Sequence, residues 1–275
     1  MKRLVAGPCV SEFGWEIMNF QALVRKASRQ YDETWVCAPE GHEALYADFH
    51  PLYMGHRICH QGVRDCWRIS GADSSAVNAT EECLKSLGGD RLLPGPYVPI
   101  EKQEFIRFGN PGASPPHLGH HSILMHARGR FGKRPECSWP QEKWDELVAL
   151  LNRQNILCTA IGTEALLPAG AADMRNIALQ ELVDLMSRPI IDLIVGPSSG
   201  PLHLASLCGL KQLVWADRRI YSAVGGTSRE RYEHKWNPFR TACVVLDRWG
   251  WQPSPVTLFD AIMSALGAAL SRTLQ

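Results

Sequence analysis

The chain has 275 residues, of which 45% are hydrophobic and 21% are charged, and its formal net charge is +1. This composition is typical of a globular protein with one large domain or two small ones. The near-neutral charge gives no electrostatic reason to expect a nucleic-acid partner or an acidic membrane surface. No apolar run approaches the roughly 20 residues that span a bilayer, although peripheral membrane contact stays open. The first residues stop being apolar too soon for an export signal, so we expect a cytoplasmic protein.

The first elements in the chain indicate a doubly wound α/β sheet. A short apolar strand over 2–6 is followed by a loop over 7–14, an amphipathic helix over 15–29 and a second strand over 34–38. This order, strand, loop, helix, strand, is the entry unit of such a sheet. The next stretch, residues 41–109, is rich in Gly, His and Pro, and its strands are weakly marked.

That stretch contains the densest group of metal-ligand residue types, His56, Cys59, His60 and Cys66. Their spacing matches no recognised zinc motif, so we favour a structural role, with a zinc site as the alternative. The chain has nine cysteines, an odd number. We expect reduced and mostly buried thiols.

Residues 110–119 are dense in Pro and Gly and are the best linker candidate. The pattern then becomes a repeating strand–helix series, which predicts a parallel sheet with right-handed crossovers. The predicted strands are 122–126, 156–161, 190–195 and 211–215, and the predicted helices are 141–152, 179–187, 201–207 and 256–274. We therefore expect two α/β domains, 1–112 and 113–275, that face a cleft at the carboxyl ends of their strands.

The most informative segment is Ile194–Ala205, a buried strand followed by a small-residue turn and a helix start. Such a turn aims backbone N–H groups and the positive end of a helix dipole at one point, which suits a diphosphate. We assign Ser198, Ser199 and Gly200 to this site. A helix N-cap without a ligand is the alternative, but it does not explain the glycines together with the nearby basic loop.

Four further groups of residues extend this hypothesis. Arg128, Arg130 and Lys133 follow a strand, and guanidinium groups match phosphate oxygens; the alternative is a solvated surface loop. His203 reaches a distal phosphate or the sugar, or is a buried histidine within the fold. Gly162 and Glu164 follow another strand and suit contact with a nucleoside. The polar and aromatic stretch 231–238 lines the acceptor side or braces the sheet.

Two carboxylates, Glu12 and Glu16, follow the first predicted strand. Either one could serve as the base that removes a proton from an acceptor hydroxyl. The alternative for Glu16 is a partner of the helix dipole, and the alternative for Glu12 is a loop residue without chemistry. The sequence does not choose between them.

The C-terminal half resembles the bacterial heptosyltransferase family. The resemblance rests on His126–Arg130, on Trp139–Trp144 and on Gly196–Ala205, which looks like that family's Asp-Ser/Thr-Gly-Pro-x-His-x-Ala motif with Pro197 at the acidic position. The segment His126–Arg130 also looks like the His-x-Arg loop of fucosyltransferases. The resemblance implies a GT-B glycosyltransferase with two Rossmann-like domains. The N-terminal domain would face the acceptor, and the C-terminal domain would hold the nucleotide sugar without a required metal.

We therefore expect an enzyme that moves a sugar from a nucleoside diphosphate sugar to a hydroxyl of a glycan or glycolipid, with inversion at the anomeric carbon. The donor is a co-substrate, and no cofactor is expected. Two alternatives stay open: a sugar-nucleotide epimerase-like enzyme of the same fold, and a nucleotide-sugar-binding protein without catalysis.

Overall fold

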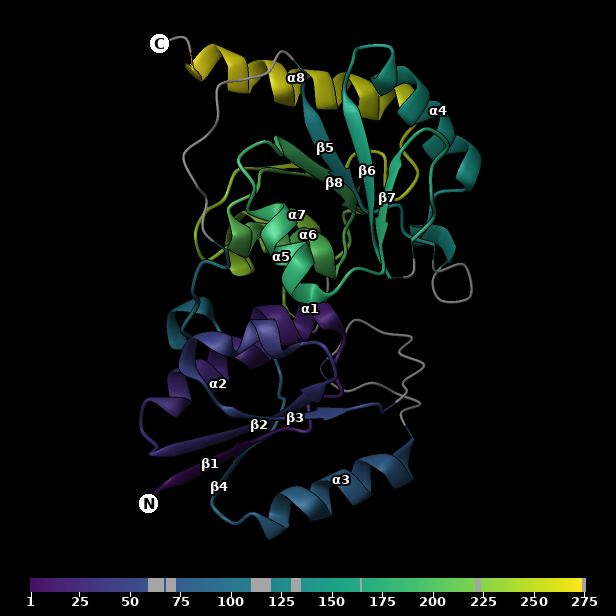
Figure 1. The fold of residues 1–275 in the computed structure, drawn as a ribbon. Coiled ribbons are helices and arrows are strands. Elements are labelled where there is room, and N and C mark those ends of the chain that lie inside the picture. Colours follow the sequence, from purple (N-terminus) through teal and green to yellow (C-terminus); the bar gives the residue numbers. More distant parts are fainter. Residues whose placement is uncertain are drawn as a thin grey trace. The chain divides into compact units, whose positions relative to one another are not determined.

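The computed structural model describes residues 1–58, 67, 73–109, 120–129, 135–163, 165–220 and 224–273, with the backbone alone for 268–273. Two compact units divide the chain, Met1–Ile106 and Arg107–Gln275. Each unit has its own parallel sheet with helices packed on it (Figure 1). The predicted linker at 110–119 lies outside the described residues.

The first unit is built on a four-stranded sheet in the order β3-β2-β1-β4. Its strands are β1 (Arg3–Ala6), β2 (Glu33–Pro39), β3 (Leu52–His56) and β4 (Asp90–Leu92). All three strand pairs are parallel. Helices α2 (Gln21–Ser28) and α3 (Ser74–Ser86) lie on opposite faces of this sheet (Figure 1). The predicted strands at 2–6 and 34–38 are confirmed, whereas β3, α3 and β4 were not predicted.

The helical segment after β1 begins at Phe13, two residues before the predicted start. It comprises α1 (Phe13–Trp15), a π-helical turn η1 (Glu16–Phe20) and α2 without interruption. The expected apolar face is present, because Ile17, Phe20 and Val24 are buried. A single π turn inside an α-helix is rare and is frequently found at functional sites. After β2 come two short 3₁₀ helices, η2 (Glu43–Leu45) and η3 (Ala47–Phe49), and after β4 comes a further one, η4 (Ile100–Lys102).

The second unit has a six-stranded sheet in the order β10-β9-β8-β5-β6-β7, with parallel pairing throughout. Its strands are β5 (Ser122–Met125), β6 (Leu157–Gly162), β7 (Ala172–Arg175), β8 (Leu193–Pro197), β9 (Gln212–Trp215) and β10 (Cys243–Leu246). The chain runs outward from β5 to β7 and then returns to β8 beside β5. This is the strand order of a dinucleotide-binding doubly wound sheet. The edge strands β7 and β10 were not predicted.

Helices α4 (Gln141–Asn152) and α8 (Pro255–Thr273) pack against each other over this sheet (Figure 1). Beneath them, Trp139, Trp144 and Trp215 are fully buried, with ring centroids 5.2–5.5 Å apart. Trp139 and Trp144 thus belong to the hydrophobic core of this unit. The remaining helices are η5 (Pro135–Cys137), α5 (Leu179–Met186), α6 (Gly200–Cys208), α7 (Ser228–Glu230) and a second π helix, η6 (Arg231–Lys235).

Strand β8 lies later than the predicted 190–195, and this corrects the position of the turn that follows it. The strand begins where it can pair with β5, with Leu193 opposite Ile123, and Ile190 is 49% exposed. At its other end Gly196 and Pro197 pair with β9. The turn between β8 and α6 is therefore only Ser198–Ser199, and Gly196 belongs to the sheet.

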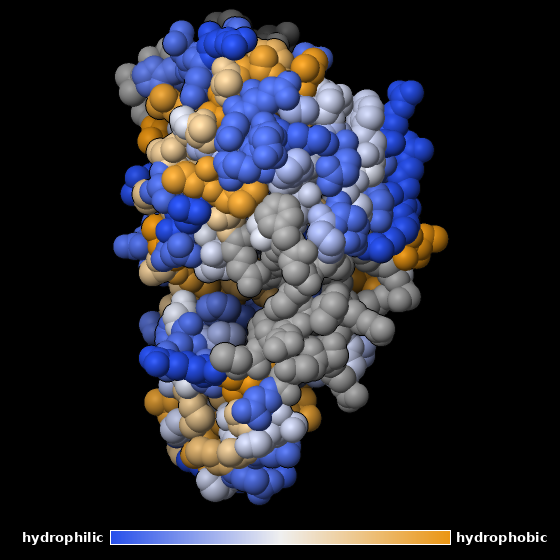
Figure 2. Space-filling view, turned by 90° about the vertical axis from the view of Figure 1, so that its right-hand side faces the viewer, coloured by the Kyte–Doolittle hydropathy of each residue, from blue (hydrophilic) through white to orange (hydrophobic). Residues whose placement is uncertain are grey.

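The surface drawn in Figure 2 is mostly hydrophilic, and its hydrophobic residues form small separate groups. Among the described residues, no helix combines the length and the apolar character needed to cross a bilayer. The seven described cysteines are free thiols, and five of them are buried, as predicted. The Nε2 of His56 forms a hydrogen bond of 2.9 Å with the carbonyl oxygen of Cys9. Its three predicted companions in a metal site, residues 59, 60 and 66, lie outside the described residues.

Candidate functional site

The topology of the second unit selects one point on its sheet edge. In doubly wound sheets, ligands bind outside the carboxyl ends of the strands, where the strand order reverses. Here the reversal falls between β5 and β8, since the chain moves away from β5 on one side and returns on the other. The residues that follow these two strands are His126–Arg128 and Ser198–Ser199, and both segments carry predicted site residues.

The Ser198–Ser199 turn leads directly into α6. Ser199 is the N-cap residue of the helix, in an extended conformation, but its side chain makes no capping hydrogen bond. Its Oγ instead lies 2.8 Å from Nδ1 of His126. The first N–H groups of a helix have no partner within the helix, and they carry its positive end. The hydroxyls of this turn are thus held by neighbouring side chains and not by the helix.

Arg128 approaches the turn from the β5 side. The residue is 4% exposed, and its Nη1 donates to the carbonyl oxygen of Ser198 at 3.4 Å. A backbone bridge between Arg128 and Ala165 and a hydrogen bond from Leu166 N to Ala127 O fix the loop against the end of β6. A guanidinium held in this way is pre-organised, and little side-chain entropy remains to be lost on binding.

A second buried arginine approaches the turn from η6. Arg231 is 3% exposed, and its Nη2 lies 3.3 Å from the Oγ of Ser198. The neighbouring Tyr232 donates its hydroxyl to Ser198 Oγ at 3.2 Å and accepts the backbone N–H of Ser199 at 3.1 Å. Burial raises the pKa of Tyr232, so its hydroxyl remains a neutral donor. Two guanidinium groups from different elements therefore converge on one serine.

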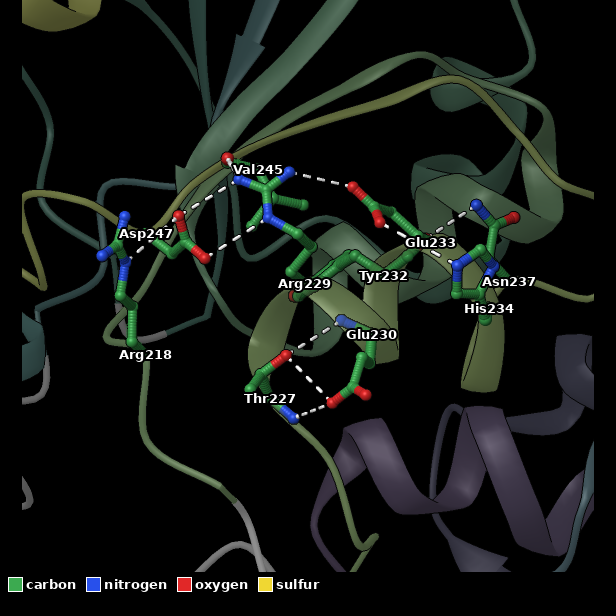
Figure 3. Close-up of polar contacts among 10 residues, drawn as sticks. All are labelled: Arg218, Thr227, Arg229, Glu230, Tyr232, Glu233, His234, Asn237, Val245 and Asp247. Atoms are coloured by element: carbon green, nitrogen blue, oxygen red, sulfur yellow. Dashed lines mark hydrogen bonds and ion pairs between the residues drawn. The ribbon is translucent and has the colours of Figure 1, made fainter.

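Figure 3 shows how the segment that carries Arg231 and Tyr232 is held. Thr227 and Glu230 form a reciprocal capping box at the start of α7, with bonds of 2.7 and 3.2 Å. Arg229 then donates to the Val245 carbonyl at 2.6 Å and to Asp247 at 3.1 Å, and its Nη1 contacts Glu233 at 3.0 Å. These contacts join η6 to the end of β10. We refer to Arg229, Glu233, Val245 and Asp247 as the β10 clamp.

His203 lies in the first turns of α6, behind the serine turn. Its ring is stacked on Tyr232 at 4.3 Å and meets Trp236 edge-on at 4.7 Å, and the residue is 2% exposed. This packing favours the interpretation of His203 as a buried histidine within the fold. It supports the ring of Tyr232, and Tyr232 contacts the turn.

The remaining predicted donor residues are only partly described. Gly162 ends β6 at a φ of +107°, and a Cβ there would lie 2.6 Å from the Cδ2 of His126. Gly162 thus allows the His126 ring to lie against the end of β6. The other three predicted residues, Arg130, Lys133 and Glu164, lie outside the described residues.

In the first unit, Glu16 opens the π turn and has no exposed surface. Its Oε2 lies 2.7 Å from Nδ1 of His42, and its Oε1 accepts the hydroxyl of Tyr46 at 2.9 Å. Burial and the nearby Glu16 charge raise the pKa of Tyr46, which keeps that hydroxyl protonated. Glu12, the other candidate base, is half-buried at the N-cap of α1 and makes no side-chain cap bond. Among the described residues, no group of three metal-ligating side chains occurs.

Comparisons with known proteins bear on the fold of the chain. No protein-family model matches the chain, and no curated protein sequence does. Two solved structures align over almost the whole chain. One is the ADP-heptose lipopolysaccharide heptosyltransferase II of E. coli, at 15% identity and a TM-score of 0.60, covering 98% of this chain and 99% of that one. The other is a family 9 glycosyl transferase from Veillonella parvula, at 12% identity and a TM-score of 0.59, covering 96% and 97%.

This fold is GT-B. At these identities the likeness establishes the architecture, and it confirms the expectation of two Rossmann-like domains. Within the GT-B fold the sequence located Ser198, Ser199 and Arg128 correctly at one edge of the second sheet. It did not assign His126, Arg231 or Tyr232 to that edge. The sequence singled out the polar and aromatic stretch 231–238, with two alternatives: that it lines the acceptor side or that it braces the sheet.

Proposed function

We propose that this protein is a glycosyltransferase that moves a sugar from a nucleoside diphosphate sugar to a hydroxyl group of a glycan or glycolipid. One observation carries the proposal. The buried guanidinium groups of Arg128 and Arg231 converge on Ser198, at the N-terminal end of α6 and at the point where the strand order reverses. Anions bind at such helix ends, and guanidinium groups match phosphate oxygens.

This arrangement suits the leaving group of glycosyl transfer. When the bond between the anomeric carbon and the diphosphate oxygen breaks, negative charge develops on the diphosphate. Fixed cations and backbone N–H groups stabilise that charge without reorganisation. The same two arginines, together with Arg130 and Lys133, would neutralise the diphosphate without a metal ion. Gly162, the last residue of β6, and Glu164, two residues later, would contact the nucleoside.

The other half of the reaction requires a base for the acceptor hydroxyl. Glu12 and Glu16 in the first unit are the two acidic groups that the sequence offers for this part of the reaction. A single displacement by the acceptor, with the diphosphate leaving from the opposite side of the sugar, would invert the anomeric carbon. Because one similar structure is described as an ADP-heptose transferase, an ADP-sugar is the first donor to test.

The direct test is a thermal-shift screen of the purified chain against ADP, UDP, GDP, dTDP and CMP, each with and without EDTA. A ligand at about 100 times its Kd stabilises the folded state by about 2.7 kcal/mol. We expect one nucleoside diphosphate to raise the melting temperature, equally in EDTA, and its parent nucleoside to do so far less. Absence of a shift with every nucleotide would refute the proposal.

Binding alone would not distinguish a transferase from a binding protein or an epimerase. The nucleotide identified in the screen is therefore supplied as its sugar conjugate, and free nucleoside diphosphate is measured by chromatography. A transferase releases it, with water as the slow acceptor. An epimerase changes the sugar and a binding protein changes nothing, and either result would contradict the assigned activity.

A further inference from the structure

The environment of Glu16 limits what this carboxylate can do. It has no exposed surface, and both of its oxygen atoms already accept hydrogen bonds, one from Tyr46 and one from the ring of His42. A group that removes a proton from an acceptor must come within hydrogen-bond reach of it. Glu16 is closed to such contact, but the His42 side chain bonded to it is 24% exposed.

The hydrogen bond to Glu16 also determines which nitrogen of His42 is basic. An ionised carboxylate can only accept, so Nδ1 of His42 must carry the hydrogen, and the lone pair of the neutral ring lies on Nε2. Among the described residues the ring makes no other hydrogen bond. Phe13 packs against the ring with centroids 5.3 Å apart, which restricts its orientation.

We propose that His42 is the general base that takes the proton from the acceptor hydroxyl, and that Glu16 is the positioning residue that orients its ring. This assignment rests on the proposed glycosyl transfer and deepens it. It replaces the choice between Glu12 and Glu16 with a pair of residues in which only the histidine touches the substrate.

The step balances without any further reactant. The acceptor oxygen forms a bond to the anomeric carbon while its proton moves to Nε2 of His42. The bond from the anomeric carbon to the diphosphate breaks, and its electron pair leaves with the nucleoside diphosphate. The imidazolium that forms is stabilised by the Glu16 carboxylate, as in other carboxylate–histidine pairs. It then returns its proton to solvent.

The surrounding charges suit a base that works near neutral pH. Burial alone would lower the pKa of His42, but the charge and hydrogen bond of Glu16, with a smaller contribution from Glu43, raise the pKa above its usual value. On β3, burial lowers the pKa of His56, so that ring is neutral at pH 7. Burial and Glu16 raise the pKa of Tyr46 and of Tyr53, so both hydroxyls are neutral as well.

The experiment compares the parent chain with His42→Gln, Glu16→Gln and Glu43→Gln. Glu43 is exposed, next to His42 in the sequence, and loses the same charge in its variant, so it controls for charge without the hydrogen bond. The readouts are nucleotide affinity by calorimetry and release of nucleoside diphosphate from the sugar nucleotide, with water as acceptor, between pH 5 and 9.

We expect His42→Gln to lower the release rate by about 10²- to 10⁴-fold, the usual contribution of a general base. Nucleotide affinity should stay within about twofold, because His42 is not among the residues assigned to nucleotide binding. Glu16→Gln should also lower the rate, since its amide can donate to Nδ1 and move the hydrogen to Nε2. In the pH–rate profile of Glu16→Gln, the fall in rate on the acid side should occur at lower pH than in the parent. Glu43→Gln should keep most of the parent rate.

Different results separate the two hypotheses. If the parent binds and cleaves the sugar nucleotide and His42→Gln does so equally well, the His42 assignment is wrong and the proposed function stands. The assignment is also wrong if Glu16→Gln leaves the acid limb in place. If the parent binds no nucleotide, the proposed function fails, and the base assignment fails with it.

Discussion

Ser199 has the position of a helix cap but not the bonding of one. The Oγ of a serine at the N-cap normally accepts a hydrogen bond from the backbone N–H two or three residues later, which satisfies one of the unpaired donors at the helix end. Here that oxygen bonds His126, and the Ser199 N–H bonds the hydroxyl of Tyr232. The serine turn is thus held from two sides by side chains, while the helix end stays available to an anion. Pre-organisation of this kind lowers the entropy lost on binding.

The first prediction concerns the guanidinium of Arg231. Arg231→Lys keeps the charge but loses the planar two-point donor. A hydrogen bond to a charged group contributes about 1.5–3 kcal/mol, so the nucleoside diphosphate should bind about 10- to 100-fold more weakly in calorimetry. Arg25→Lys is the matched control, because Arg25 is equally buried but pairs with Asp48 in the first unit. An unchanged nucleotide affinity in Arg231→Lys would contradict the assignment of Arg231 to the diphosphate site.

The second prediction separates backbone strain from crowding at Gly162. Gly250 also has a positive φ, +61°, but a Cβ there meets nothing within 4 Å. Gly250→Ala should therefore cost about 1–2 kcal/mol in the free energy of unfolding, the penalty of a left-handed conformation. Gly162→Ala should cost more and should also weaken nucleotide binding, because its Cβ displaces His126. Equal losses of stability in urea titrations, with nucleotide affinity intact, would contradict this explanation.

At the scale of elements, periodicity predicted the buried helices and strands well and the marginal ones poorly. Helix α4 has the predicted bounds, 141–152, because its apolar residues repeat at helical spacing. The edge strand β7 (Ala172–Arg175) is mostly exposed and carries no hydrophobic pattern, so no local signal marks it. The π helix η6 is held by the capping box and by the β10 clamp. The contacts of the β10 clamp join segments that are distant in the sequence, so no local pattern indicates them.

The site shows the same division between local and distant information. Ser198, Ser199 and Arg128 follow strongly marked strands, so the sequence placed them at one edge. Glu16 and His42 are 26 residues apart and follow neighbouring strands, β1 and β2. The order strand, helix, strand implies that the carboxyl ends of β1 and β2 lie side by side. This order is the one feature of the sequence that could have indicated that Glu16 and His42 are close together. The sequence could not show that Glu16 would be closed off by Tyr46.

The third prediction tests the β10 clamp as the support of η6. Asp247→Asn weakens the hold on Arg229, so amide exchange across 228–236 should accelerate and nucleotide affinity should fall several-fold. Hydrogen bonds from Arg229 lower the pKa of Asp247, so the clamp is lost only as pH falls through that lowered value. The difference between parent and variant should therefore be constant from pH 5 to 8. Arg218→Gln is the control, since Arg218 is 68% exposed and 3.8 Å from Asp247.

At the scale of the whole molecule, each unit has its own sheet, core and chemistry. The second unit is built around three tryptophans whose rings pack edge-on or tilted against one another, and it carries the arginines and serines of the candidate diphosphate site. The first unit packs Val5, Cys37 and Leu84 across its sheet and carries the carboxylate–histidine pair. The donor and the base are thus assigned to different units, and their contributions can be measured separately.

The fourth prediction follows from this division. A ligand that binds only the folded state stabilises the part of the protein that forms its site, by about 2.7 kcal/mol at 100 times its Kd. With saturating nucleoside diphosphate, hydrogen exchange should slow in β8, the start of α6 and η6. Exchange in β1, β2 and η1 should be unchanged, since none of the assigned donor residues lies there. His42→Gln should give the same protection pattern as the parent, whereas Arg231→Lys should lose it at the same nucleotide concentration. Protection confined to the first unit would place the nucleotide on the wrong unit and contradict the assignment of Arg128 and Arg231.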